Sequence, residues 1–308
     1  PRRHLFNKNN DPAVKEIMHA SRSLVWVKPD FVVVYDRAKS KQAGYFKRFW
    51  LSLPSVPQIN GNVASAVASE EWDTTDWSGG QPISTYYSEP KAKLFVTTLL
   101  PLGATISSDT NKPVGPSGGV VASGEVMKAR LLIEAPGNPA ETRFLNLLQV
   151  TDPGPSVQPV AASHVASSSG TPFEGAVFSD TAVMFPVNLD TPFASLVYSV
   201  PAATTTHYVT GLAKNAAYDV GLQTANGITT VTVTPNGSTA LTDSGGVLVL
   251  GANGLPTVSI AATDSLAGES GPDSATLTIS RSGSLASPLT VNLATGGTAT
   301  AGDYTLAA

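Results

Sequence analysis

Residues Ser23–Lys41 read SLVWVKPDFVVVYDRAKSK, and this stretch decides the fold class. Its two halves, SLVWV and FVVVYDR, are rich in Val and aromatic residues that favour β-strands, and KPD between them is typical of a turn. The stretch therefore predicts a β-hairpin. Its second strand ends in Asp36, whose carboxylate resists burial. We expect Asp36 to lie outside the core, accepting backbone N–H bonds in a turn or pairing at the surface with Arg37 or Lys39.

The rest of the chain repeats this pattern of short Val- and Thr-rich segments separated by Gly, Pro, Ser and Asp. We therefore predict an all-β protein of antiparallel β-sandwich domains in tandem, with at most one short helix near the N-terminus. The helix candidate is residues 10–22, NDPAVKEIMHASR, where Pro12 follows a potential N-cap, Asp11. A loop leading into the first strand is the alternative for these residues.

Composition suggests how the chain divides. We expect an antiparallel β-domain at residues 1–155 and a small, polar linker or surface loop at 156–172. A smaller β-region follows at 173–252 and an incomplete β-domain at 256–308. Both ends of the chain look cut, so we interpret it as a piece of a longer polypeptide.

Composition also bears on location and partners. The chain has no cysteine, which is common in large secreted bacterial β-proteins, and no run of 18 apolar residues that predicts a membrane span. We expect a secreted or extracellular protein.

Residues 1–50 hold eleven Lys and Arg against four acids, whereas residues 151–308 hold two against ten. This asymmetry favours an anionic partner for residues 1–50, such as an acidic polysaccharide. A solvated basic face is the alternative. Nucleic acid is not expected, because no arginine-rich helix is present.

The candidate polysaccharide-binding residues combine positive charge and aromatic rings. They are Lys39, Lys41, Lys47, Arg48, Trp72 and Trp77. Strand alternation places Tyr45, Lys47 and Phe49 on one face, and Phe46, Arg48 and Trp50 on the other.

Residues 1–250 resemble the C-terminal β-domain of heparinase II/III-like polysaccharide lyases. The resemblance is carried by SLVWVKPDFVVVYDRAKSKQAGYFKRFWLSLPS at 23–55, TRFLNLLQVTDP at 142–153, HYVTGLAKNAAYDV at 207–220 and GGVLVL at 245–250. The Gly-Leu of the third segment, with Tyr218, is also similar to fibronectin type III-like sandwiches. In the lyase family an α/α toroid precedes this domain and supplies most catalytic residues, and residues 1–22 are too few to form one.

The lyase resemblance implies two kinds of site. Several family members bind a structural zinc through a His, an Asp at a strand end and a later His; His19 and Asp36 match the first two, and Ser52 stands near the expected third. Such lyases abstract a proton beside a uronate carboxylate, often with Tyr or His as the base. Tyr45 and His19 are the catalytic candidates at matching positions, and we do not expect catalysis by this chain alone.

Residues 256–305 resemble a Calx-beta repeat that lacks its last strands. This resemblance implies a calcium site at Glu269 and Asp303, with turn residues as the alternative. Beyond zinc or calcium, no cofactor is suggested. The open edge of such a repeat would pair with a neighbouring copy. Two functions remain: the non-toroid β part of a polysaccharide lyase-like protein that contacts an anionic polysaccharide, or a secreted structural or adhesive protein that assembles through this β-edge.

Overall fold

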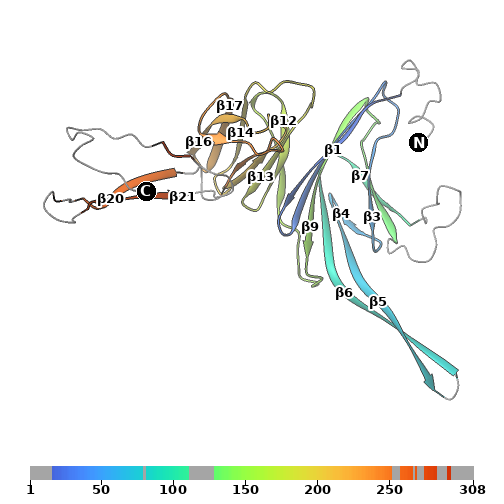
Figure 1. The fold of residues 1–308 in the computed structure, drawn as a ribbon. Coiled ribbons are helices and arrows are strands. Elements are labelled where there is room, and N and C mark those ends of the chain that lie inside the picture. Colours follow the sequence, from blue (N-terminus) through green and yellow to red (C-terminus); the bar gives the residue numbers. More distant parts are fainter. Residues whose placement is uncertain are drawn as a thin grey trace. The chain divides into compact units, whose positions relative to one another are not determined.

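The computed structural model describes residues 16–78, 81–110, 128–251, 257–265, 268, 274–282 and 290–292; within its strands, the side chains of residues 70–88, 257, 259 and 280–282 are left undescribed. The chain forms two compact units, Pro1–Val249 and Leu250–Ala308. The described residues are all-β, with strands in several sheets and no helix (Figure 1). The predicted fold class is therefore confirmed.

The first sandwich of the larger unit is made of two antiparallel sheets. Sheet I has six strands in the order β1 (Ile17–Val27), β2 (Phe31–Ser40), β9 (Glu141–Thr151), β6 (Gln81–Leu100), β5 (Val63–Ser78) and β4 (Gln58–Asn60). Sheet II has the order β3 (Arg48–Leu53), β8 (Ala129–Glu134) and β7 (Thr105–Asp109). The predicted hairpin is confirmed, because β1 and β2 form an antiparallel pair in which Val27 stands opposite Phe31 next to the turn.

The second sandwich follows with two five-stranded sheets. Sheet III has the order β10 (Ala162–Ala166), β12 (Phe173–Phe178), β13 (Thr181–Pro186), β15 (Thr206–Val209) and β19 (Leu248–Leu250). Sheet IV has the order β11 (Ser169–Gly170), β14 (Leu196–Pro201), β17 (Ile228–Pro235), β16 (Ala217–Ala225) and β18 (Ala240–Leu241). The β13–β15 pair is parallel. A buried hydrogen bond of 2.9 Å between the Tyr198 hydroxyl and His207 Nδ1 links sheet IV to sheet III.

Strand β2 is buried on both faces of sheet I, which explains its uninterrupted apolar run. Val34 lies in a core cluster with sheet II residues such as Phe49 and Ile133. Its neighbours Val33 and Tyr35, which point the opposite way, lie in a cluster with sheet III residues such as Phe185. The four sheets therefore stack in the order II, I, III, IV, and the two predicted β-regions share one core.

Two local expectations are wrong. Residues 17–22 of the expected helix belong to β1, where pairing with β2 overrides a weak N-cap signal, and residues 10–15 lie outside the described part of the chain. The expected linker at 156–172 contains β10 and β11, which pair with β12 and β14. Its Ser- and Ala-rich composition conceals these strands, because their ladders use backbone groups, which residues of any type supply.

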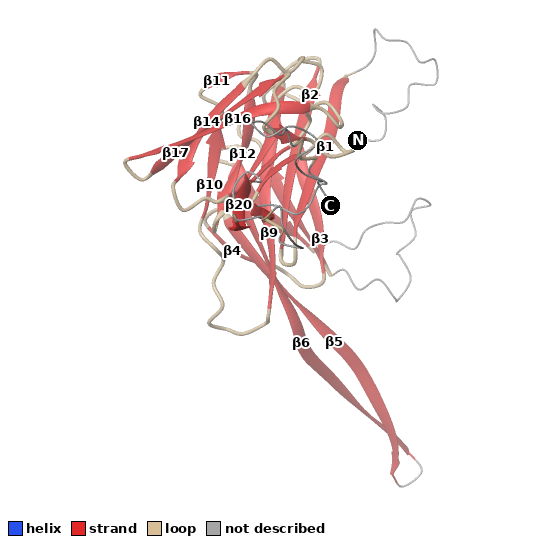
Figure 2. Ribbon diagram, turned by 60° about the vertical axis from the view of Figure 1, so that its left-hand side comes forward, coloured by secondary structure: helices blue, strands red, loops and turns tan. Residues whose placement is uncertain are grey.

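The outer halves of β5 and β6 form a two-stranded arm that extends beyond the first sandwich (Figure 2). Ser69–Ser78 pairs with Gln81–Pro90, and the register shifts between Ala68 and Ser69 where the arm begins. Further along β6, Lys93–Leu100 pairs with β9 inside sheet I.

The described part of the second unit is a single antiparallel pair, β20 (Thr257–Asp264) and β21 (Thr276–Ser282). Ile260 stands opposite Ile279, and both side chains are exposed. Across both units, the described residues contain no helix of the length and apolarity needed to span a membrane.

Candidate functional site

A tethered loop brings the aromatic and basic residues of 41–47 back against the start of β1. After β2 ends at Ser40, the backbone N–H of Lys41 donates to the carbonyl oxygen of Glu16 at 2.8 Å. Gly44, at φ +94°, donates to the carbonyl oxygen of Asn138 at 2.8 Å. A residue with a side chain rarely adopts this φ, so Gly44 allows the chain to reverse here.

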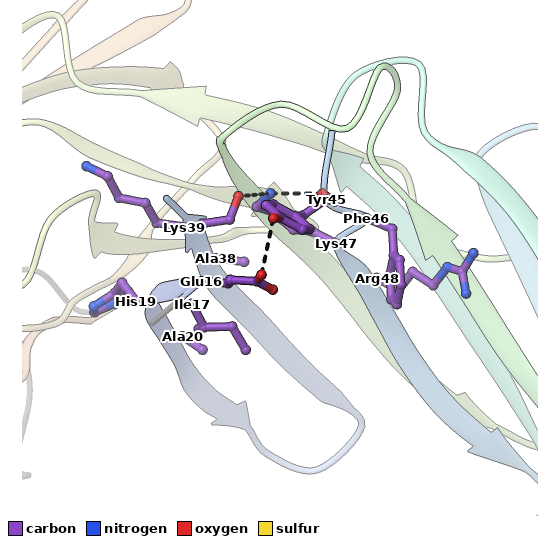
Figure 3. A pocket seen from close by; sticks show the side chains of 11 residues that line it. Glu16, Ile17, His19, Ala20, Ala38, Lys39, Tyr45, Phe46, Lys47 and Arg48 are labelled. Carbon is purple, nitrogen blue, oxygen red and sulfur yellow. Dashed lines mark hydrogen bonds between the residues drawn. The ribbon is translucent and has the colours of Figure 1, made fainter. Parts of the chain in front are cut away.

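The loop and strands β1, β2 and β3 enclose a cavity of about 260 Å³ (Figure 3). We call it the front cavity, and it is lined by Glu16, Ile17, His19, Ala20, Ala38, Lys39, Ser40, Tyr45, Phe46, Lys47 and Arg48. It gathers five of the candidate residues predicted from the sequence. They are His19 on β1, Lys39 on β2, Tyr45 and Lys47 in the loop, and Arg48 on β3. Apolar side chains, aromatic rings, cations and the Glu16 carboxylate therefore line the same cavity.

Tyr45 and Phe46 contribute different chemistry to the front cavity. The Tyr45 hydroxyl donates to Glu16 Oε1 at 3.2 Å, which places a hydroxyl and a carboxylate side by side. Phe46 is 50% exposed, and the Arg48 guanidinium lies 4.4 Å from the centre of its ring. Burial alternates along 45–50 as predicted, because Lys47 and Phe49 are buried while Phe46, Arg48 and Trp50 are exposed.

The Lys47 side chain is buried rather than exposed to solvent. Its ammonium donates to Ser40 Oγ at 2.7 Å, to the Pro139 carbonyl oxygen at 2.6 Å and to its own loop at the Tyr45 carbonyl oxygen at 3.1 Å. These bonds use all three of its N–H donors, and burial lowers its pKa. Lys47 therefore fixes the loop, a role that the sequence did not indicate.

The other predicted cations have acidic neighbours on adjacent strands. Lys39 Nζ lies 3.4 Å from Glu141 with both side chains about half exposed, and Arg48 Nε lies 2.5 Å from Glu134. Lys41 is exposed at the loop. Exposed ion pairs are worth only about 0–1 kcal/mol. An anionic ligand can therefore replace the carboxylate partners of Lys39 and Arg48 at a small cost in free energy.

His19 and Asp36, the predicted zinc ligands, are not brought together. His19 pairs with Lys39 in the ladder while Asp36 pairs with Arg22, three residues further along, so their side chains lie on opposite faces. Ser21 Oγ lies 2.8 Å from His19 Nε2. Among the described residues, no group of three or more His, Cys, Asp or Glu is placed to hold a metal ion.

The expected partners of Asp36 are wrong. Both of its carboxylate oxygens accept hydrogen bonds from Arg22, at 2.7 Å each, rather than from a turn, Arg37 or Lys39. These bonds raise the pKa of Arg22. The carboxylate is thus satisfied across the hairpin, by the residue directly opposite it. Arg37 instead turns inward, where its guanidinium donates to Pro186 and Val187 carbonyl oxygens at 2.9 and 3.1 Å.

A second cavity, of about 280 Å³, adjoins the front cavity and shares His19, Ala38 and Lys39 with it. Its other lining residues are Met18, Arg37, Glu141, Val187, Asn188, Leu189 and Asp190. The segment after β13 that supplies four of them was missed by sequence reasoning. No local signal could have placed it beside β1, because its position follows from the packing of sheet III on sheet I.

Several predicted residues lie elsewhere or outside the description. Trp72 and Trp77 stand on the arm, opposite Tyr87 and Pro82 in its register, and their side chains are not described. The predicted calcium ligands Glu269 and Asp303 lie outside the described residues.

Comparisons with known proteins add no assignment. No protein-family model matches the chain, and no curated protein matches it in a sequence search.

Proposed function

We propose that this chain is a non-catalytic polysaccharide-binding β-module, the β part of a secreted lyase-like protein, and that the front cavity contacts an anionic polysaccharide. The observation that carries the proposal is the convergence of Lys39, Arg48, Phe46 and the Tyr45–Glu16 pair on one cavity.

The chemistry of the cavity supports a sugar more than a simple anion. The exposed face of Phe46 suits the apolar face of a pyranose ring. The Arg48–Glu134 pair and the Tyr45–Glu16 pair supply both donors and acceptors for hydroxyl groups. Lys39, which is half exposed at the junction of the two cavities, supplies charge for a carboxylate or sulfate group.

The same geometry supports binding without catalysis. Tyr45, one candidate base, directs its hydroxyl hydrogen to Glu16 on the cavity wall rather than to His19. His19, the other candidate, points its ring away from Tyr45 in the close view (Figure 3). The two groups therefore do not form an acid–base pair across the cavity.

Chromatography on immobilised heparin and alginate tests the proposal. We expect the chain to be retained at low salt and released as salt rises, because exposed charges are screened within a Debye length, about 8 Å at physiological ionic strength. The double variant Lys39→Ser/Arg48→Ser should elute at lower salt. Lys91→Ser is the matched control, since Lys91 is an equally exposed lysine paired with Glu89 at the base of the arm. Equal elution of the double variant and the control would contradict the proposal.

The second unit favours an alternative, a structural or adhesive role through self-association. Four exposed apolar residues lie on one face of the β20–β21 pair, where Ile260 stands opposite Ile279, namely Val258, Ile260, Leu277 and Ile279. A two-stranded sheet with an uncovered apolar face is marginally stable alone in water. Sedimentation at increasing concentration tests this alternative: assembly that is abolished by Ile260→Ser would support it, and a monomer at all concentrations would refute it.

A further inference from the structure

Strand β3 and the loop before it carry a row of exposed aromatic and cationic side chains that begins at the front cavity and extends beyond it. Phe46 and Trp50 are 50% and 37% exposed, and Arg48 lies between them in sequence. The Arg48 guanidinium is 4.4 Å from the centre of the Phe46 ring and 5.9 Å from that of Trp50. Three successive outward positions therefore form one contiguous surface.

Neighbouring strands fix this row in place. Arg130 on β8 lies 4.9 Å from the Trp50 ring and 3.1 Å from Asp109 on β7. Arg48 is held by Glu134, the residue opposite it on β8. Each guanidinium is thus positioned by a carboxylate and rests on an aromatic ring. A surface whose side chains are already ordered loses less entropy when a ligand binds.

The row is continuous with the front cavity. Phe46 and Arg48 line the cavity, whereas Trp50 and Arg130 do not. Four residue steps of extended chain lead from Phe46 to Trp50, a distance of about 13 Å at 3.3 Å per residue. A ligand that reaches both rings must therefore be an extended chain.

We propose that an acidic polysaccharide continues from the front cavity along the outer face of β3, stacks one sugar ring on Trp50 and places anionic groups beside Arg48 and Arg130. This inference rests on the proposed function and extends it to the length of the ligand. A polysaccharide fits because it repeats an apolar ring face and an anionic group along one chain, and the row repeats an aromatic ring and a guanidinium. An isolated sugar or a free anion satisfies only one end of the row.

Titration calorimetry with uronate oligosaccharides of two lengths, a disaccharide and a hexasaccharide, tests the inference. We expect the wild type to bind the hexasaccharide more tightly. Trp50→Ala should weaken hexasaccharide binding about threefold to tenfold, as expected for one aromatic stacking contact of roughly 0.5–1.5 kcal/mol, and leave disaccharide binding unchanged. Trp26→Ala is the matched control, because Trp26 is exposed on β1 and lines neither cavity.

A second variant tests the inference independently in case Trp50→Ala does not fold. Arg130→Gln keeps a polar side chain and should reduce both hexasaccharide affinity and its salt dependence. If Trp50→Ala and Arg130→Gln bind the hexasaccharide as the wild type does, the inference is overturned while the proposed function stands. If the wild type binds neither oligosaccharide, the proposed function itself fails, and this extension with it.

Discussion

The hydroxyl of Tyr35 on β2 donates a hydrogen bond of 2.8 Å to Glu174 on β12, which joins the two sandwiches. The same carboxylate accepts a bond of 2.8 Å from Arg143 on β9. Arg37 stacks over the Tyr35 ring at 4.5 Å and reaches across to the chain after β13. Burial and Glu174 raise the pKa of Tyr35, so the hydroxyl stays protonated as a donor. This polar cluster fixes sheet III, and with it the far wall of the second cavity.

Arg37→Ala should lower the free energy of unfolding by about 2–4 kcal/mol, because the carbonyl oxygens of Pro186 and Val187 lose a charged donor in a buried setting. The control is Lys39→Ala, whose pair with Glu141 has both side chains about half exposed and should be worth at most about 1 kcal/mol. Urea titration measures both variants. Equal losses would show that the inter-sheet contact is no stronger than a surface pair.

Stability should fall on acidification through His207. Burial lowers its pKa to about 4, against 6.5 for an unfolded histidine. Between these values the unfolded chain binds a proton that the folded chain does not, so the free energy of unfolding decreases as pH falls from 6.5 to 4, by up to about 3 kcal/mol. His207→Asn retains polar groups near Tyr198 but cannot titrate. Its stability should therefore change less than that of the wild type over this range, in urea titrations at each pH; identical slopes would contradict this assignment.

The arm should be dispensable for both folding and binding at the front cavity. Replacing residues 71–88 by an Asn-Gly turn, between the paired residues Glu70 and Glu89, closes the hairpin near sheet I, where β5 and β6 still pair. We expect a change in the free energy of unfolding within about 0.5 kcal/mol, because among the described strands the ladder of the arm joins β5 and β6 only to each other. Retention on heparin should also be unchanged. Loss of retention would assign binding to Trp72 and Trp77, the residues predicted from the sequence.

We expect no β-elimination by this chain on heparin, heparan sulfate, alginate or ulvan. The physical reason is the engagement of the Tyr45 hydroxyl by Glu16, together with the orientation of His19 away from it. Ultraviolet absorbance of unsaturated products measures the reaction. Turnover that disappears in Tyr45→Phe would show that the cavity is catalytic.

Strand positions and faces were predictable from local pattern. The hairpin around KPD and the alternation along 45–50 follow from residue type and a two-residue period, and both are confirmed. The near-continuous apolar run of β2 reflects burial on two faces, a pattern that the sequence does contain.

Partners were not predictable, because they depend on register and on sheet stacking. Asp36 meets Arg22 only because β1 and β2 pair with that offset. Arg37 is buried because the second sandwich covers its side of sheet I, which its place in a basic tract conceals. Lys47 likewise reads as a surface cation, although the Pro139 carbonyl oxygen, remote in sequence, holds it inside.

Hydrogen–deuterium exchange, with and without a saturating acidic hexasaccharide, tests most directly whether the front cavity is the binding site. Bound sugar should slow exchange of the amides in residues 16–20 and 36–50, the segments that contain the lining residues of the cavity, with further protection at 129–134 if the chain runs along β3. Amides of residues 217–235 on sheet IV serve as the internal control and should not change. Protection confined to sheet IV or to the arm at 69–90, with none at 36–50, would contradict the account.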